Sequence, residues 1–197
     1  TIDRDINTTG ANGITLYAIR DLTLNALRTL TTGATGALDL RAASTAGTAG
    51  TGNLTLNGNI SMGSGALTMR SGINGTRPNY TMTTTNFVPQ GATVGAFDIQ
   101  GFNDFTVDRN ITSSGGVTVV AFRDLVISAT RTLATGAAGA MNLQAANGST
   151  AGTGNLSILG NLSSGTSGLT LVSGANGTRP SWTANTTTLG RLGASFG

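Results

Sequence analysis

The chain contains a long internal duplication: residues 13–85 return, in the same order, as residues 116–188. GITLYAIRDLTLNALRTLTTGATGALDLRAA becomes GVTVVAFRDLVISATRTLATGAAGAMNLQAA, and NLTLNGNISMGSGALTMRSGINGTRPNYT becomes NLSILGNLSSGTSGLTLVSGANGTRPSWT. Of the 64 ungapped positions in 13–43 and 53–85, 36 carry the same residue in both copies. A chain that repeats itself in this way usually stacks similar units against their neighbours. Polar groups that occupy equivalent places in both copies are therefore expected to be architectural.

The differences between the copies separate core positions from corner positions. Apolar positions keep their hydrophobicity while their shape changes: Leu16, Leu24 and Leu38 become Val119, Ile127 and Met141. This tolerance is typical of a core, where similar volume matters more than identity. Glycine and turn residues are retained instead, as in the NGTRP segments at 74–78 and 176–180. The duplicated pattern therefore predicts buried strands joined by fixed corners.

Short runs with alternating apolar residues recur through both copies, for example LTLN at 22–25, LDLR at 38–41, LTMR at 67–70 and VTVV at 117–120. Alternation of this kind places one side chain inward and the next outward on a strand. No stretch has a sustained helical period, so we expect an all-β protein with little or no helix. The strand motif recurs in one orientation and the gaps between strands are irregular, which favours a parallel solenoid over hairpins.

The runs group into about eight coils, which we place at residues 1–20, 21–52, 53–80, 81–104, 105–123, 124–154, 155–182 and, in part, 183–197. The first repeat then spans 1–104 and the second, truncated repeat spans 105–197, together forming one continuous solenoid. Neither end of the sequence resembles a cap, so we expect either a window on a longer array or chains that stack end to end.

Composition excludes several classes of function. The 197 residues include no His, Cys, Lys or Glu, so every charged side chain is Arg or Asp, and the net charge is +3. The arginines are spread along the chain, whereas nucleic-acid binding needs a concentrated basic patch. No apolar stretch approaches the length of a membrane span. Without a signal peptide or an initiating Met, the chain is interpreted as a mature or excised segment.

Segments such as NLTLNGNISMGSGALTM and FTVDRNITSSGGVTVVA resemble the coils of filamentous-haemagglutinin-type exoproteins, the large β-helical adhesins and cytolysins of bacterial two-partner secretion. The resemblance covers most of the chain as a pattern of Leu-Thr-Leu strands, Asn-Gly corners and Gly-Ser turns. It implies a right-handed parallel β-helix that is secreted or displayed on the surface of a Gram-negative cell. The amino-terminal secretion domain of that family is not identifiable in this sequence.

Catalysis has few routes in this composition. Without His, Cys and Lys there is no nucleophile triad, no usual zinc ligand set, no Schiff base and no P-loop. Paired aspartates with arginine remain, as polysaccharide-cleaving enzymes could use them. The candidates are Asp3, Asp5, Asp21, Asp39, Asp98, Asp104, Asp108 and Asp124. Because the Asp-Arg pairs recur along the rod, we interpret them as corner charges and expect no enzymatic activity, no cofactor and no metal.

Two further sets of residues are weaker candidates. Asn-x-Ser/Thr triplets offer glycosylation acceptors at Asn53, Asn59, Asn74, Asn155, Asn161 and Asn176, although unmodified corner asparagines that bond to neighbouring backbone are the favoured interpretation. Tyr80 and Trp182 follow the two NGTRP corners, where they could stack on a sugar, although an aromatic ring that caps the core is the favoured interpretation.

The hypothesis that follows is a non-enzymatic repeat segment of an extracellular fibre or adhesin shaft. Its expected partners are neighbouring repeats, identical chains stacked end to end, or host and cell-surface glycans. A carbohydrate-binding or polysaccharide-cleaving β-helix is the second hypothesis, and a unique Asp/Arg cleft found in one copy alone would favour the enzyme. An ice-binding solenoid is the third, and ranks of Thr hydroxyls on a flat face would favour it.

Overall fold

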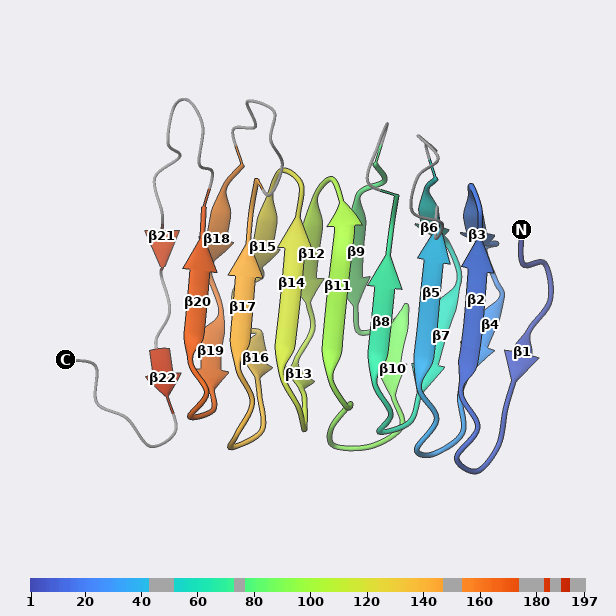
Figure 1. Cartoon of the computed structure of the whole chain (residues 1–197), viewed down its shortest axis with the longest axis horizontal. Helices are drawn as coiled ribbons and strands as arrows, with labels where there is room; N and C mark the ends of the chain where they lie inside the picture. Colours follow the sequence, from blue (N-terminus) through green and yellow to red (C-terminus); the bar gives the residue numbers. More distant parts are fainter. Residues whose placement is uncertain (43–51, 73–76, 147–153, 174–182, 185–188, 192–197) are drawn as a thin grey trace.

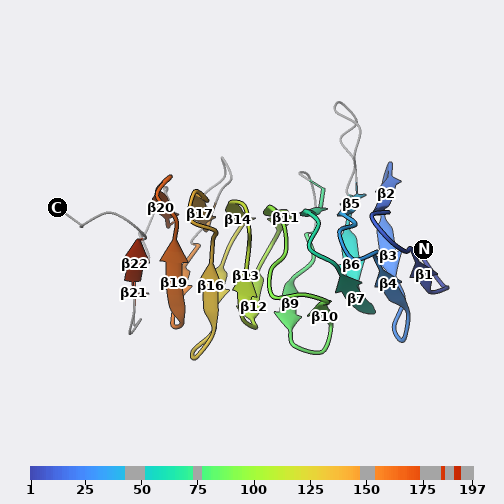
Figure 2. The ribbon, with the colours of Figure 1, turned by 90° about the horizontal axis from the view of Figure 1, so that it is seen from below.

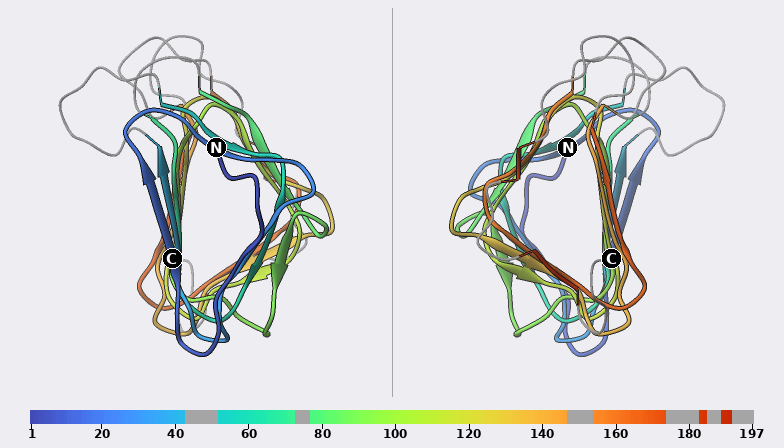
Figure 3. Two further views of the ribbon diagram at one scale, coloured as in Figure 1. Left: turned by 90° about the vertical axis from the view of Figure 1, so that its right-hand side faces the viewer. Right: turned by 90° about the vertical axis from the view of Figure 1, so that its left-hand side faces the viewer.

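The computed structural model describes residues 1–42, 52–72, 77–146, 154–173, 183–184 and 189–191. Within these residues the chain is all-β, and every strand pair is parallel. The strands stack into a β-solenoid, whose coils follow one another along the long axis from the amino to the carboxyl terminus (Figures 1 and 2). Viewed along that axis the coil is roughly triangular, with three flat faces (Figure 3).

The first face is one continuous sheet of seven strands, here called the long sheet. Its strands all rise in Figure 1, and the chain then passes behind them and descends while it advances toward the carboxyl terminus, which makes the solenoid right-handed. The long sheet consists of β2 (Ile14–Ala18), β5 (Leu38–Ala42), β8 (Leu67–Arg70), β11 (Phe97–Phe102), β14 (Val117–Ala121), β17 (Met141–Gln144) and β20 (Leu169–Val172).

The second face consists of a pair of strands followed by a sheet of five. The pair is β3 (Leu22–Leu24) and β6 (Leu54–Leu56), and the sheet is β9 (Tyr80–Thr83), β12 (Phe105–Asp108), β15 (Leu125–Ile127), β18 (Leu156–Ile158) and β21 (Thr183–Ala184).

The third face consists of two sheets of four strands. The first contains β1 (Ile6–Asn7), β4 (Thr29–Thr31), β7 (Asn59–Met62) and β10 (Phe87–Pro89), and the second contains β13 (Ile111–Thr112), β16 (Thr132–Ala134), β19 (Asn161–Ser164) and β22 (Leu189–Arg191). A single bridge between Val94 and Ser113 links coils on either side of the break.

The number of coils is smaller than the sequence pattern predicts. The boundaries drawn from the sequence separate the strands well, with three strands in each inner segment. The first segment contains β1 and β2 and, at Ile2, a parallel bridge to Leu24 on the second face, whereas the described residues of the last segment contain β21 and β22 but no strand of the long sheet. Among the described residues, the long sheet accordingly has seven strands and not eight. The count was too high because the incomplete last segment was treated as a coil.

Period-two alternation builds the core. In β5 the burial runs buried, intermediate, buried, intermediate, buried, so that Leu38, Leu40 and Ala42 point inward. Directly paired inward residues, such as Leu38 and Leu67, repeat this arrangement from coil to coil. Burial of each such side chain contributes about 1.5–3 kcal/mol. The core is therefore one continuous apolar column inside the triangle.

The core has a different composition in the two coils where the repeats meet. Four of the six Phe in the sequence, Phe87, Phe97, Phe102 and Phe105, lie here, and all four are fully buried. The rings of Phe102 and Phe105 lie 5.4 Å apart between centroids and both contact Tyr80. Tilted aromatic pairs at such distances add to the stabilisation that burial itself provides. The junction between the copies is thus filled by larger side chains than the leucine-rich coils on either side.

Buried hydroxyls and glycines hold one corner of the triangle together. The Thr32 hydroxyl accepts a hydrogen bond from the backbone N–H of Gly63 in the next coil (3.0 Å), and Thr135 accepts one from Gly165 in the same way (2.7 Å). A Cβ at Gly63 would lie 2.2 Å from the carbonyl oxygen of Ala34. Only glycine fits where two coils approach this closely. The glycines that the two copies share are therefore a requirement of coil stacking.

Candidate functional site

The outward side chains of the long sheet form two parallel rows that run along the solenoid. Register pairs join each residue to its neighbour in the next coil, so that Asp39 lies between Thr15 and Thr68, and Arg41 lies between Tyr17 and Arg70. The first row is Thr15, Asp39, Thr68, Asp98, Thr118, Asn142 and Thr170. The second row is Tyr17, Arg41, Arg70, Gln100, Val120, Gln144 and Val172.

Every second strand of the long sheet carries a hydrogen-bonded pair that links the two rows. In β5 the Arg41 guanidinium donates to both carboxylate oxygens of Asp39, from Nε at 2.7 Å and from Nη2 at 2.8 Å. In β11 the Gln100 amide donates to Asp98 at 2.8 Å. In β17 the Gln144 amide donates to Asn142, also at 2.8 Å. Side chains two residues apart on one face of a strand are close enough for this contact.

Contacts between coils join these pairs into a charged cluster in the first repeat. The Tyr17 hydroxyl donates to Asp39 at 2.8 Å, and the Arg41 guanidinium carbon lies 5.1 Å from the centre of the Tyr17 ring. One coil further on, Arg70 forms an ion pair with Asp98. The hydrogen bond to Asp39 raises the pKa of Tyr17 and also raises the pKa of Arg41. At neutral pH Tyr17 is therefore a neutral phenol and Arg41 a cation.

The second repeat has the same fold at this place without the charges. Tyr17, Asp39 and Arg41 correspond to Val120, Asn142 and Gln144, and Arg70 corresponds to Val172. The Asp/Arg cluster is thus present in one copy alone. It lies on the outer face of a sheet, where both oxygens of Asp39 already accept hydrogen bonds.

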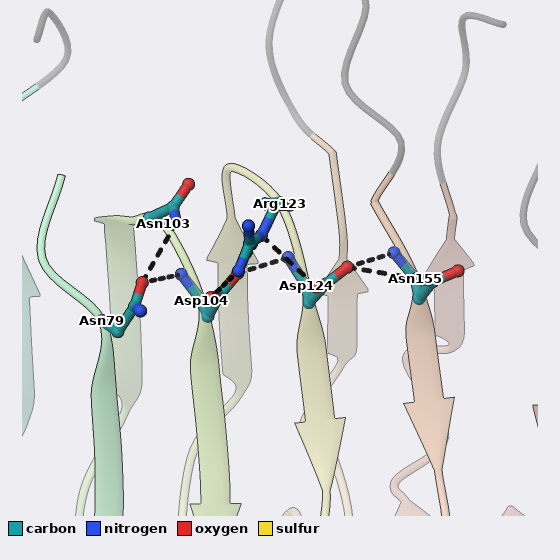
Figure 4. A network of polar contacts seen from close by, with 6 residues as sticks. All are labelled: Asn79, Asn103, Asp104, Arg123, Asp124 and Asn155. Carbon is teal, nitrogen blue, oxygen red and sulfur yellow. Dashed lines mark hydrogen bonds and ion pairs between the residues drawn. The ribbon is translucent and has the colours of Figure 1, made fainter. Parts of the chain in front are cut away.

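A second polar column lies at the corner that precedes the second face (Figure 4). An Asp or Asn comes directly before β3, β6, β9, β12, β15 and β18, and at four of these positions its side-chain oxygen accepts a hydrogen bond from the backbone N–H of the equivalent residue in the next coil. The observed bonds are Asn53 to Asp21 (3.0 Å), Asp104 to Asn79 (3.2 Å), Asp124 to Asp104 (3.3 Å) and Asn155 to Asp124 (2.8 Å). Such a ladder satisfies backbone donors that the tight corner leaves without a strand partner.

Electrostatics strengthens this corner column. Arg123 donates to Asp104 through Nε (2.7 Å) and Nη2, and it also contacts Asp124 at 3.4 Å. Its hydrogen bond to Asp104 raises the pKa of Arg123. The backbone hydrogen bond from Asn53 holds the pKa of Asp21 below its ordinary value. Asp21, Asp104 and Asp124 are therefore parts of the corner.

Other aspartates considered as candidates serve the corner that precedes the third face. Asp5 accepts a hydrogen bond from the backbone N–H of Thr29 (2.9 Å), and Asp3 accepts one from the amide of Asn25 (3.0 Å). Asp108 accepts one from Arg131 (3.0 Å). Of the eight candidate aspartates, only Asp39 and Asp98 belong to the charged cluster on the long sheet. Within the described part of the chain, no group of three or more potential ligands is placed to hold a metal ion.

The Asn-x-Ser/Thr triplets arise from the strand geometry. In Asn53-Leu54-Thr55 and Asn155-Leu156-Ser157, the Asn stands at the corner, the Leu is fully buried and the hydroxyl residue points outward. Asn59-Ile60-Ser61 and Asn161-Leu162-Ser163 repeat this arrangement on the third face. A corner followed by an alternating strand is thus sufficient by itself to produce the triplet. Asn74 and Asn176 lie outside the described residues.

Tyr80 occupies a core position. Its side chain is buried, its ring contacts Phe102 and Phe105, and burial raises the pKa of its hydroxyl. A ring enclosed in this way offers no face to a sugar, so the core interpretation holds for Tyr80. Trp182 lies outside the described residues. The exposed aromatic ring on the long sheet is Tyr17, with 55% of its surface accessible.

Sequence reasoning missed the long-sheet cluster because it paired each aspartate only with an arginine next to it in the sequence. The signal was present in the strands LDLR, FDIQ and MNLQ, where an Asp or Asn stands two residues before an Arg or Gln in every second coil. Alignment of the strands by coil would have revealed it. The described residues contain no helix, and therefore none that is long and apolar enough to cross a membrane. Comparison with protein-family models, with curated proteins and with solved structures gives no match.

Proposed function

We propose that the chain is a non-enzymatic segment of an extracellular β-solenoid fibre or adhesin shaft of a bacterium. The observation that carries the proposal is the long sheet, which runs without a break from β2 to β20 across both repeats. A rod built in this way transmits load through backbone hydrogen bonds in every coil. Its length grows with the number of repeats while its cross-section stays the same.

The distribution of polar contacts supports a structural role. The corner ladder and the buried hydroxyl column recur in both copies, and their partners are backbone groups of the adjacent coil. Groups used in this way stabilise stacking and need no ligand. The end-to-end assembly that belongs to this proposal would continue the same stacking from one chain, or one repeat, to the next. The model for such a contact between chains is the contact between the two copies, where β11 and β14 pair in parallel and Phe97 lies opposite Val117.

Two measurements test this proposal. Negative-stain microscopy of the purified chain should show straight rods of constant width that lengthen with protein concentration, with light scattering reporting the same growth in mass. In the native cell, an antibody against the chain should label intact cells, and externally added protease should remove the label. Discrete compact monomers at every concentration would contradict end-to-end assembly. Label that appears only after lysis would contradict a surface shaft.

A further inference from the structure

The outer face of the long sheet has a period of two coils. Its first row alternates without exception, with Thr in β2, β8, β14 and β20 and with Asp or Asn in β5, β11 and β17. The hydrogen-bonded pair that links the rows recurs in the same three strands, at Asp39–Arg41, Asp98–Gln100 and Asn142–Gln144. Strands in a sheet lie about 4.8 Å apart, so equivalent groups recur about every 10 Å along the rod.

Neither folding nor charge repulsion accounts for this alternation. The fold is specified by inward residues, and the outward residues of the second face do not alternate: Thr23, Thr55, Thr81, Thr106, Val126 and Ser157. Separation of like charges would explain the Thr between Asp39 and Asp98. It does not explain why Arg41 and Arg70 are direct neighbours. The Thr residues beside Asn142 repeat those beside Asp39 through the internal duplication, and the hydrogen-bonded pair is kept there although both of its members have lost their charge.

We propose that this face binds an extended, uncharged polysaccharide that lies along the rod axis. A β-linked polysaccharide ribbon turns over at each sugar, so that it presents the same edge at every second sugar. A surface on which the same hydrogen-bonding pair returns at every second coil complements such a ribbon. The alternation also separates equivalent hydroxyls by two coils, whereas an ice-binding face would need them in every coil.

The chemistry of the rows fits hydroxyl groups. Each pair combines a carboxylate or amide acceptor with a guanidinium or amide donor, and the hydrogen bond between its members restricts both side chains before a ligand arrives. Such preorganisation lowers the entropy lost on binding. The exposed Tyr17 ring, held by Asp39 and covered on one side by Arg41, adds an apolar surface at one end of the rows.

Charge selects the uncharged polymer over a polyanion. In the rows, Asp39 and Asp98 balance Arg41 and Arg70, so the charged cluster is neutral as a whole. The part of the rows in the second repeat has no charged side chain at all, from Val120 to Val172. A polyanion would meet no net positive field on this face. The hydroxyl groups of a sugar both donate and accept hydrogen bonds, so they can bond to the donors and to the acceptors of the two rows.

The experiment measures binding of the full chain to insoluble cellulose and chitin, which are uncharged β-linked polymers, with heparin as the polyanion. The test variant is the double substitution Gln100→Val and Gln144→Val, because Val120 and Val172 already occupy the same row. The matched control is the double substitution Thr106→Val and Ser157→Val on the second face, where Val126 lies between the two residues. Circular dichroism and melting temperature establish that both variants fold.

We expect saturable binding to at least one uncharged polymer, with little dependence on salt. The dissociation constant should rise tenfold or more in the test variant and stay within twofold in the control. Absence of binding to both uncharged polymers, or equal losses in both variants, would overturn the proposal. So would binding to heparin alone that disappears with salt, or a test variant that changes only the oligomeric state, which would make this face a contact between copies. The rod proposal survives each of these results, because microscopy tests it separately.

Discussion

At the scale of the residue, one step along a strand decides whether a side chain supports the core or faces solvent. In β6, Leu54 is fully buried, Thr55 points outward, and Leu56 packs against the core while staying partly exposed. The alternation in the sequence predicts the first two placements. It does not predict that Leu56 is less buried than its counterpart Ile158 in the second copy, because that depends on how well the neighbouring coil covers it.

Aspartate substitutions along β6 should therefore differ sharply in cost. We expect Leu54→Asp to lower the free energy of unfolding by about 3 kcal/mol or more, since it buries an unpaired charge. Leu56→Asp should cost less, and Thr55→Asp should cost less than about 1 kcal/mol because its carboxylate stays hydrated. Denaturant unfolding followed by circular dichroism gives the three values. Equal costs for Leu54→Asp and Thr55→Asp would show that β6 is not oriented in this way.

The acid stability of the chain should depend in part on Asp21. Its folded pKa lies below the ordinary value of about 3.9, chiefly because its carboxylate accepts the backbone N–H of Asn53. A lowered folded pKa contributes stability above the unfolded pKa, and this contribution is lost as the pH falls through the folded pKa. Asp21→Asn keeps an oxygen acceptor, as Asn79 does at the equivalent corner.

The comparison is made by measuring melting temperatures of the wild type and Asp21→Asn from neutral pH down to about pH 2. The melting temperature of the wild type should exceed that of Asp21→Asn at neutral pH. The difference should shrink from about pH 5 downward, so that the two curves converge in acid. Curves that remain parallel over the whole range would mean that Asp21 has the same pKa in the folded and unfolded chain.

At the scale of the element, the strands are short and the corners hold them in register. The buried hydroxyl column and the glycines beside it bring successive coils together at one corner, as Thr32 and Gly63 show. Sequence repetition identifies these glycines as fixed positions. It does not reveal what each glycine approaches, because Gly63 meets the carbonyl of Ala34, which lies a full coil earlier in the chain.

Two glycine substitutions should separate close stacking from simple turn formation. Gly63→Ala places a Cβ 2.2 Å from the Ala34 carbonyl oxygen, so we expect a loss of about 1–3 kcal/mol and a melting temperature lower by several degrees. At Gly91 the nearest atom to a new Cβ is 4.0 Å away, and Gly91→Ala should be neutral or stabilising by up to about 1 kcal/mol. Differential scanning calorimetry compares the two. A harmless Gly63→Ala would mean that the coils are further apart than this corner requires.

At the scale of the whole molecule, the solenoid is a series of interchangeable units. Each inner coil contributes one strand to each face, and the long sheet passes from one repeat to the next without interruption. Stability in such an architecture is close to a sum over units and their interfaces. The number of repeats can then change as long as the strands of the three faces still follow one another in the same order along the chain.

Removal of one repeat tests this modularity. Deletion of residues 13–115 joins Asn12 to Gly116, so that β1 leads into β14 as β13 normally does. We expect this shorter chain to keep the β-rich circular dichroism spectrum with a lower melting temperature. Deletion of residues 26–115 joins β3 to β14 and omits the third face of that coil, so it should abolish cooperative folding. Equal stability of the two deletions would contradict stacking in phase.

The sequence by itself determined which residues face inward, where the corners lie and that the strands stack in parallel, because alternation and glycine act over a few neighbouring residues. It also supplied the coil boundaries, although it overstated the number of complete coils. The triangular cross-section and the neighbours across coils were decided by the tertiary structure alone. Tyr17 meets Asp39 at a separation of 22 residues, and Arg70 meets Asp98 at a separation of 28. These contacts depend on the hydrogen-bond register between coils, which the corners set together, so no single segment of the sequence contains them.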